Sequence, residues 1–348
     1  MPNDHRICRP ISLAVTAFAL LLPCAAWGSA FNFISVNDPN LGDTPPFIQL
    51  LGINNAGTIV GYTGMGTPNP NRGIILLLPN SFTSLNPNIN PATCTTCQVQ
   101  VFGITNSGTT TDGFFTDATG LTHGFVDPGN LPTATTVDGP PALSNGTNTQ
   151  LLGLDPTGTE AAGFFTDTTG LTHAFSYAVG TNSSSELPQG LSSGPVATDN
   201  SMATGVNDSG MVVGFDMPSS TVSNGFLFSN GVYTRIQFPG STFTEPLAVN
   251  NNGEIVGTYT DADGNMHGFS DINSSFTSFD APGGVGTTTA NGVNGLGDIV
   301  GFSMNGAATV GFEAIPTPEP GTMLFGLIGT AMAAVTWRIR RRRGAIGS

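Results

Sequence analysis

Three histidines stand at one repeated position in this chain. His123, His173 and His267 each precede glycine or alanine and then phenylalanine. Imidazole is a common metal ligand, so three such side chains turned to one axis could share a metal ion. Alternation along a strand instead places each histidine on the face of the phenylalanine two residues later. The equivalent positions hold Arg72, Asn224 and Val310. This pattern favours a packing role for the histidines.

A second candidate is the acidic segment Asp261-Ala262-Asp263-Gly264-Asn265. Carboxylate and amide oxygens at alternate positions resemble the start of a calcium loop, which makes Asp261, Asp263 and Asn265 weak calcium candidates. The bidentate glutamate of a complete EF-hand is absent from the positions that follow. Equivalent segments carry Thr119 and Thr169 in place of the second aspartate. We therefore expect an ordinary hairpin turn and no obligatory cofactor.

Cys94 and Cys97 are the two cysteines beyond residue 30. In an oxidising compartment such a pair most simply forms a disulfide that closes a small loop. A redox-active pair would need a thioredoxin-like βαβ context, and zinc would need two further ligands at suitable spacing. The surrounding sequence supplies neither. A structural disulfide is favoured, with redox and metal roles as alternatives.

The sequence indicates no catalytic constellation. Gly-x-Ser-x-Gly elbows, phosphate-binding loops and a Ser/His/Asp set are not found. Glycoside hydrolysis needs only two carboxylates, and isolated acids are plentiful, but most of them fall in turns of the repeat. We expect no enzyme, and an extracellular hydrolase remains the alternative.

The elements that position these residues come from an internal repeat. The signature Gly-Ile-Asn-x-x-Gly-x-Ile-Val-Gly occurs six times, at intervals of 51, 50, 52, 43 and 44 residues. Its copies begin at Gly52, Gly103, Gly153, Gly205, Ala248 and Gly292. The Asn-x-x-Gly portion predicts a tight hairpin turn, because asparagine bonds its own backbone and glycine supplies a positive φ. Copies two and three carry one extra residue, which suggests a β-bulge there.

Two further signatures follow each copy. One is the His-Gly/Ala-Phe segment, and the other is Phe-Thr-x-x-Asp/Asn-x-Pro, as at 82–87 and 276–282. About four strands per repeat of 43–52 residues predict an all-β, six-bladed β-propeller over residues 31–315. The last copy lacks its fourth strand, and residues 31–39 resemble one, so this N-terminal strand is expected to close the propeller. A solenoid or a sandwich is the alternative.

Composition excludes other classes. Glycine (47) and proline (25) are abundant and charged residues form only 9%, which argues against helical bundles. The net charge of −14 divides unevenly along the chain. Residues 31–317 contain two arginines, no lysine and 21 acidic residues, a net charge of −19. Because nucleic-acid binding depends on cations that neutralise phosphates, nucleic acid is excluded as a partner.

Residues 1–30 have the layout of a signal peptide. Arg6 and Arg9 precede the apolar run 11–22, and small residues follow up to Ala30. The apolar run is too short for a membrane anchor, which needs close to 20 residues. We expect export, with cleavage before Phe31; cleavage after Gly28 is the alternative.

The other end combines Pro318-Glu319-Pro320, an apolar stretch at 323–337 and five arginines at 338–343. Such a stretch predicts a short transmembrane helix, held by the arginines on the cytoplasmic side. Residues 316–348 resemble the PEP-CTERM sorting tail of Gram-negative bacteria. That resemblance implies recognition and cleavage by an exosortase-type membrane protease, transient residence in the inner membrane, and release to the cell surface or extracellular matrix. A plain C-terminal membrane anchor is the alternative.

The repeats over residues 48–312 resemble those of HAF-repeat extracellular proteins, although copies one, four and six lack the histidine. This resemblance supports repeats and export and implies no particular chemistry. We therefore expect an exported surface or matrix propeller with a structural or binding role, with exopolysaccharide as a possible partner. The first alternative is a calcium- or carbohydrate-binding module, and the second is the hydrolase.

Overall fold

The computed structural model describes residues 31–37, 45–64, 71–78, 81–85, 98–129, 134–140, 144–188 and 200–317. Within these ranges every regular secondary-structure element is a β-strand, which confirms the all-β prediction. The described ranges contain no helix that is long and apolar enough to cross a membrane. Several predicted features lie outside the described residues: the signal peptide, Cys94 and Cys97, the sorting residues Pro318, Glu319 and Pro320, and the C-terminal helix.

The strands follow one another with short connections, as the glycine-rich turns predict. In chain order they are β1 (Phe31–Val36), β2 (Ile48–Ile53), β3 (Thr58–Thr63), β4 (Arg72–Leu77), β5 (Ser81–Leu85), β6 (Gln98–Ile104), β7 (Thr111–Thr116), β8 (Thr122–Asp127), β9 (Thr135–Val137), β10 (Ser144–Leu154), β11 (Glu160–Asp167), β12 (Thr172–Ala178), β13 (Ser183–Glu186), β14 (Asn200–Val206), β15 (Val212–Ser219), β16 (Val222–Ser229), β17 (Val232–Ile236), β18 (Phe243–Val249), β19 (Ile255–Thr260), β20 (Met266–Ile272), β21 (Ser275–Phe279), β22 (Thr289–Val293), β23 (Ile299–Asn305) and β24 (Ala308–Pro316).

Antiparallel pairing organises these strands into groups of four. Groups one to five are β2–β5, β6–β9, β10–β13, β14–β17 and β18–β21, and group six is β22–β24 with β1 on its outer edge. Single parallel residue pairs, Asn148 with Thr122 and Ser223 with Phe243, join groups two to three and four to five into eight-stranded sheets. The repeat seen in the sequence is therefore one antiparallel meander.

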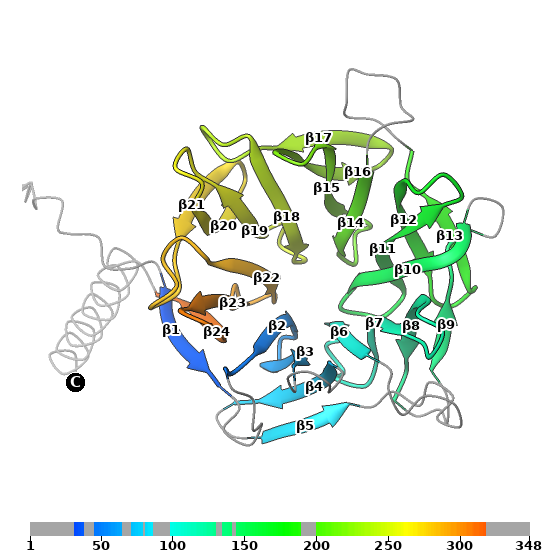
Figure 1. Ribbon diagram of the computed structural model, residues 1–348, viewed down its shortest axis with the longest axis horizontal. Helices are drawn as coiled ribbons and strands as arrows, with labels where there is room; N and C mark the ends of the chain where they lie inside the picture. Colours follow the sequence, from blue (N-terminus) through cyan, green and yellow to red (C-terminus); the bar gives the residue numbers. More distant parts are fainter. Residues whose placement is uncertain are drawn as a thin grey trace, which may run out of the picture. The chain divides into compact units, whose positions relative to one another are not determined.

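The first strands of the groups lie around a common axis (Figure 1). Each contacts the next in chain order, β2 to β6, β10, β14, β18 and β22, and β22 contacts β2. Apolar side chains fill the space between neighbouring groups, as where Val60 of β3 packs with Val101 of β6. The core is thus divided into layers between groups, and every group depends on two neighbours for burial.

The signature turn has the predicted local structure. In group one the N–H of Gly57 donates to the carbonyl of Asn54 (3.0 Å), and Gly57 has a φ of 75°. The side-chain Oδ1 of Asn54 accepts the N–H groups of Ala56 and Thr58. The turn is therefore held by its own asparagine, which confirms the hairpin prediction.

The bulge expected in copies two and three is present in all six copies and lies elsewhere. In group one the register shifts between Leu50 and Gly52, within the first strand, and the same shift recurs in the other groups. Gly61 lies opposite the shift, where an added Cβ would lie 2.1 Å from the carbonyl oxygen of Gln49. The last glycine of the signature is required by this close approach. The extra residue of copies two and three instead lengthens the turn, so that Thr105 bonds to Thr110.

The N-terminal strand occupies the position expected of it. β1 runs antiparallel to β24, with Phe31 opposite Pro316 and Val36 opposite Gly311. Phe31 is buried and its ring centroid lies 4.9 Å from that of Phe279 in group five. The strand therefore covers the edge of β24 and also contributes to the core.

Candidate functional site

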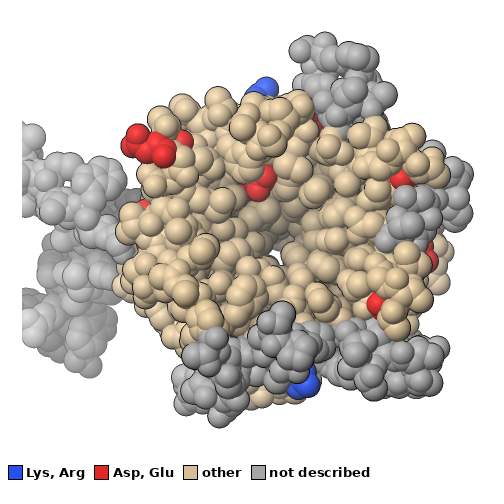
Figure 2. Space-filling model, in the orientation of Figure 1, with Lys and Arg blue, Asp and Glu red and all other residues tan. Residues whose placement is uncertain are grey.

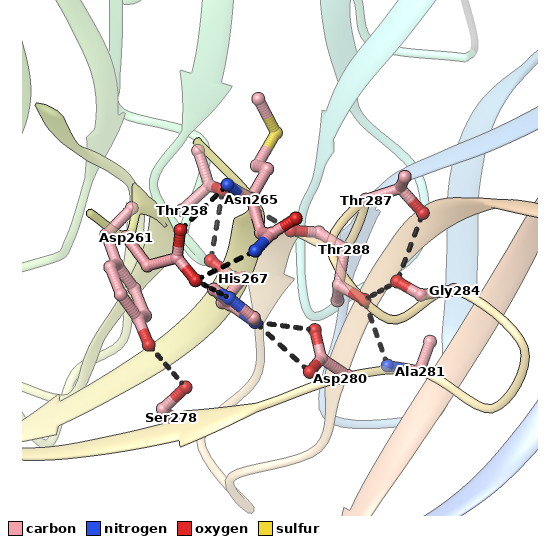
Figure 3. Close-up of polar contacts among 12 residues, drawn as sticks. Thr258, Asp261, Asn265, His267, Ser278, Asp280, Ala281, Gly284, Thr287 and Thr288 are labelled. Carbon is pink, nitrogen blue, oxygen red and sulfur yellow. Dashed lines mark hydrogen bonds and ion pairs between the residues drawn. The ribbon is translucent and has the colours of Figure 1, made fainter. Parts of the chain in front are cut away.

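The three histidines each bridge two carboxylates. In group five, Nε2 of His267 lies 3.1 Å from Oδ2 of Asp261, and Nδ1 lies 3.0 Å from Oδ1 of Asp280 (Figure 3). The imidazole also stacks on Tyr259 of the neighbouring strand, with ring centroids 5.3 Å apart. Both ring nitrogens face acceptors, an arrangement that the doubly protonated ring satisfies. We name this arrangement of a histidine, two carboxylates and an aromatic ring a histidine clamp.

Groups two and three contain the same clamp. Each histidine stacks on a phenylalanine of the preceding strand at 5.2–5.3 Å between centroids. The nitrogen–oxygen distances are 3.6 and 2.7 Å in group two and 3.1 and 2.8 Å in group three. The residues are His123 with Asp117, Asp138 and Phe115, and His173 with Asp167, Glu186 and Phe165.

Two local features position each clamp. The first carboxylate begins the turn between the second and third strands, where Oδ1 of Asp261 accepts the N–H groups of Asp263 and Asn265. The second carboxylate ends or follows the fourth strand, as Asp280 follows β21. The third strand carries the histidine between them, so strand pairing alone brings the three side chains together.

In group five, electrostatics favours the charged forms of Asp261 and His267. Hydrogen bonds from the Asn265 side chain and backbone and from His267 hold the pKa of Asp261 well below its usual value, against a smaller opposing effect of burial. Burial acts to lower the pKa of His267, but the hydrogen bonds and negative charges of Asp261 and Asp280 outweigh it and raise that pKa. The shift favours the protonated ring of His267, which links the turn at Asp261 to Asp280 at the end of the outer strand β21.

The clamp accounts for the predicted calcium residues. Oδ2 of Asp261 accepts hydrogen bonds from Asn265 and His267, and its Oδ1 is occupied by the turn, so both oxygens already face donors. In the described ranges no group of three His, Cys, Asp or Glu side chains is placed to hold a metal ion. Asp261, Asp263 and Asn265 therefore lie together as expected, but in a turn stabilised by its own hydrogen bonds.

The acidic partners on the fourth strand were missed from the sequence, although a signal was present. The groups with a histidine have Asp138, Glu186 or Asp280 at the acid position of the Phe-Thr-x-x-Asp/Asn-x-Pro signature or its equivalent. The groups without it have Asn86, Gln237 or Asn37 there. In group four the Asn224 side chain accepts a hydrogen bond from Arg235, a residue of β17. In the repeat copies, a histidine on the third strand thus occurs together with an acidic residue at the end of the fourth strand.

A cavity lies on the axis where the first strands meet. It has a volume of about 90 Å³ and is lined by glycine or alanine from each group: Gly52, Gly103, Gly153, Gly205, Ala248 and Gly292. Its remaining lining is apolar, amide or hydroxyl, so the two carboxylates of a glycosidase do not lie here. The volume suits a few water molecules, well below the 300–1,000 Å³ or so of small-molecule sites.

A larger groove lies between groups four and five. About 450 Å³ is bounded by the β15–β16 turn, the β17–β18 connection and the β19–β20 turn. Ser220, Thr221, Thr242 and Phe243 line it, and Asp261 of the clamp forms one wall. The face shown in Figure 2 has few charged atoms, scattered in small groups. The groove offers hydroxyl groups, one aromatic ring and the Asp261 carboxylate.

Comparison with known proteins locates the sorting signal. Residues 316–342 match the model of the PEP-CTERM protein-sorting motif. This match confirms the predicted tail and marks an exported protein that an exosortase-type system sorts. No curated protein matches this sequence. The resemblance to HAF-repeat proteins stays a prediction.

Solved structures resemble the fold. A TolB protein from Agrobacterium tumefaciens is 14% identical, with a TM-score of 0.52 over 78% of this chain and 92% of that one. TolB from Acinetobacter baumannii is 14% identical, with a TM-score of 0.46 over 79% of this chain and 65% of that one, so the chain spans just under two thirds of its length. A lectin from Aleuria aurantia is 10% identical, with a TM-score of 0.47 over 81% of this chain and 100% of that one. The Agrobacterium likeness supports a β-propeller-like fold.

Proposed function

We propose that this chain is an exported, closed six-bladed β-propeller with a structural or binding role at the cell surface or in the extracellular matrix. The match to the sorting motif at 316–342 is the observation that supports this destination. Six four-stranded groups around one axis, with β22 against β2 and β1 on β24, support the closed architecture. The repeat is then used to build a rigid body outside the cell.

Amide side chains in the signature turns support closure. Nδ2 of Asn207 donates to the carbonyl of Asn250 (2.9 Å), and Asn250 in turn donates to that of Asn294 (2.8 Å). Asn294 then donates to the carbonyl of Asn54 (3.2 Å), which joins the last group to the first across 240 residues of sequence. Asn54 donates to the carbonyl of Thr105 (3.0 Å). This chain of hydrogen bonds is the observation that most favours a ring.

Fractionation of the native host tests the destination. We expect the protein in the surface or matrix fraction with a reduced mass when the exosortase is intact, and an unprocessed membrane form when the exosortase gene is deleted. Deletion of residues 318–343 should give the same loss of sorting. The sorting proposal would be overturned if the surface location and the processed mass were unchanged both in the exosortase-deleted host and in the variant that lacks residues 318–343.

A second candidate is glycan binding in the groove between groups four and five. Hydroxyl groups beside the partly exposed Phe243 ring are suited to a neutral sugar, because stacking and hydrogen bonds together recognise such ligands. Calorimetry of the mature protein with host exopolysaccharide, and separately with calcium, tests both binding alternatives. If neither the exopolysaccharide titration nor the calcium titration gave heat, the binding-module candidate would be overturned.

A further inference from the structure

The sorting motif begins inside a strand that the start of the folded body covers. The PEP-CTERM match starts at Pro316, the last residue of β24. Pro316 lies directly opposite Phe31, and Ile315 lies opposite Asn32. The segment that matches the sorting motif therefore starts at a strand pair made by the first two residues of β1.

The two edges of β24 are not covered equally. On its inner edge the ladder to β23 ends with Ile299 opposite Ala314. On its outer edge the ladder to β1 continues for two more residues. Within the described strands, Ile315 and Pro316 are thus paired by β1 alone. The Phe31 side chain, 7% exposed and packed in the core beside Phe279, anchors that end of β1.

We propose that Phe31 and Asn32 form a clasp that controls access of the exosortase-type protease to the sorting motif. This inference rests on the proposed sorting. Proteins that bind a peptide by adding it as a strand to a sheet use its backbone hydrogen-bonding groups, which must first be free of other strand partners. With the clasp closed, only Thr317 separates the paired strand from Pro318. Opening the clasp releases Ile315 and Pro316 from β1, which is about 7 Å of extended chain.

The processing step itself is ordinary peptide-bond cleavage. In its hydrolytic form one peptide bond breaks, the new carboxyl group takes its oxygen from water, and the new amine takes the proton. The clasp contributes no chemistry to this step. It determines how far the scissile segment reaches from the folded body, and so how often the protease can bind it.

A disulfide across the clasp tests the proposal in the full-length chain. Asn32 is exposed and Ile315 half-buried, and paired Cα atoms in an antiparallel ladder lie within disulfide range. We would make Asn32→Cys/Ile315→Cys in a Cys94→Ser/Cys97→Ser background and follow the mass of the tail in the native host. A matched control is Asn305→Cys/Ala308→Cys, a paired position at the far end of the β23–β24 ladder.

The clasp predicts processing at least threefold slower in the locked variant than in the background or the control. Inserting Gly-Ser-Gly-Ser after Thr317 in the locked variant should restore the rate, because the insertion supplies the missing reach. Wild-type processing of chains whose disulfide is demonstrated on a non-reducing gel would overturn the clasp. An unprocessed background chain would instead overturn the sorting proposal on which the clasp rests.

Discussion

Asp112 lies where the other five groups place a valine or an alanine. The equivalents are Val60, Ala162, Val213, Val256 and Val300, all fully buried. Asp112 is also fully buried, and neither carboxylate oxygen has a hydrogen-bond partner of good geometry. Burial raises its pKa to about 7, against the weak opposing effect of the peptide N–H groups of Gly103 and of Asp112 itself. The buried Asp112 carboxyl therefore lowers the stability of the interface between groups two and three.

Replacement Asp112→Val should stabilise the protein, and more so at higher pH. Because the folded pKa is raised, the stability available at acidic pH is lost as pH rises from the unfolded value of 3.8 through about 7. Between pH 5 and pH 8, wild type should therefore lose about 2–3 kcal/mol more than the valine variant, which keeps other titrating groups such as Glu245. Urea unfolding at the two pH values measures the difference.

Asp112→Asn serves as the control for charge. It keeps the shape and removes the titration of residue 112, so the pH dependence of its stability should match that of the valine variant, without the full gain in stability expected from valine. If the valine variant kept the pH dependence of wild type, Asp112 would not be its source.

At the scale of elements, the signature turn does two jobs with one side chain. Oδ1 of Asn250 accepts the N–H groups of Asn252 and Glu254 and so holds its own hairpin. Nδ2 of the same residue donates to the carbonyl of Asn294 in the next group. Copy two has Thr105 and copy three has Asp155 at this position. Groups two and three are joined instead by the N–H of Asn106, which donates to the carbonyl of Pro156.

We expect Asn250→Ala to lower the free energy of unfolding by about 2–3 kcal/mol, because buried backbone donors and an acceptor lose their partner. Chemical denaturation of the purified mature protein gives the value. The neighbouring Asn251→Ala is the comparison: its amide joins Asp208 at an exposed site, where the loss should stay below about 1 kcal/mol. Equal losses in the two variants would refute a special role for the buried amide.

At the scale of the whole molecule, burial is shared around the axis. Each apolar layer draws on two neighbouring groups, and β1 brings Phe31 into the layer of groups five and six. Repeat arrays of this kind depend on contacts between neighbours, and in the closed ring that we propose no repeat is terminal. A substitution that weakens β1 should therefore destabilise all the groups together.

Replacement Phe31→Ala is expected to destabilise by about 3–5 kcal/mol, as other buried phenylalanine truncations do. Unfolding followed by far-UV circular dichroism and by tyrosine fluorescence should shift together, since Tyr62, Tyr177, Tyr233 and Tyr259 lie in four different groups. Ile34→Ala on the same strand, 41% exposed, should cost less than about 1 kcal/mol. Separate transitions by the two probes would show that closure does not couple the groups.

Much of this architecture could be predicted because it depends on local chemistry. The turn at Asn54 and Gly57 is held by bonds within five residues, so its type follows from the residues themselves. Period and turn spacing then gave the all-β fold, the four-strand repeat and the displaced strand at residue 31. The sorting tail was equally local, because its motif, apolar stretch and arginines are contiguous.

Tertiary structure decided everything that depends on which surfaces meet. His267 meets Asp280 only through the register of β20 with β21. Asp112 is buried without a hydrogen-bond partner in β7, a strand that contacts β10 of group three. The calcium candidates became parts of a turn and a clamp once that register was set. Phe31 and Pro316, 285 residues apart, became neighbours through the β1–β24 ladder. Sequence periodicity specifies each repeat, whereas side-chain environment and the pairing of distant strands arise only when the repeats pack together.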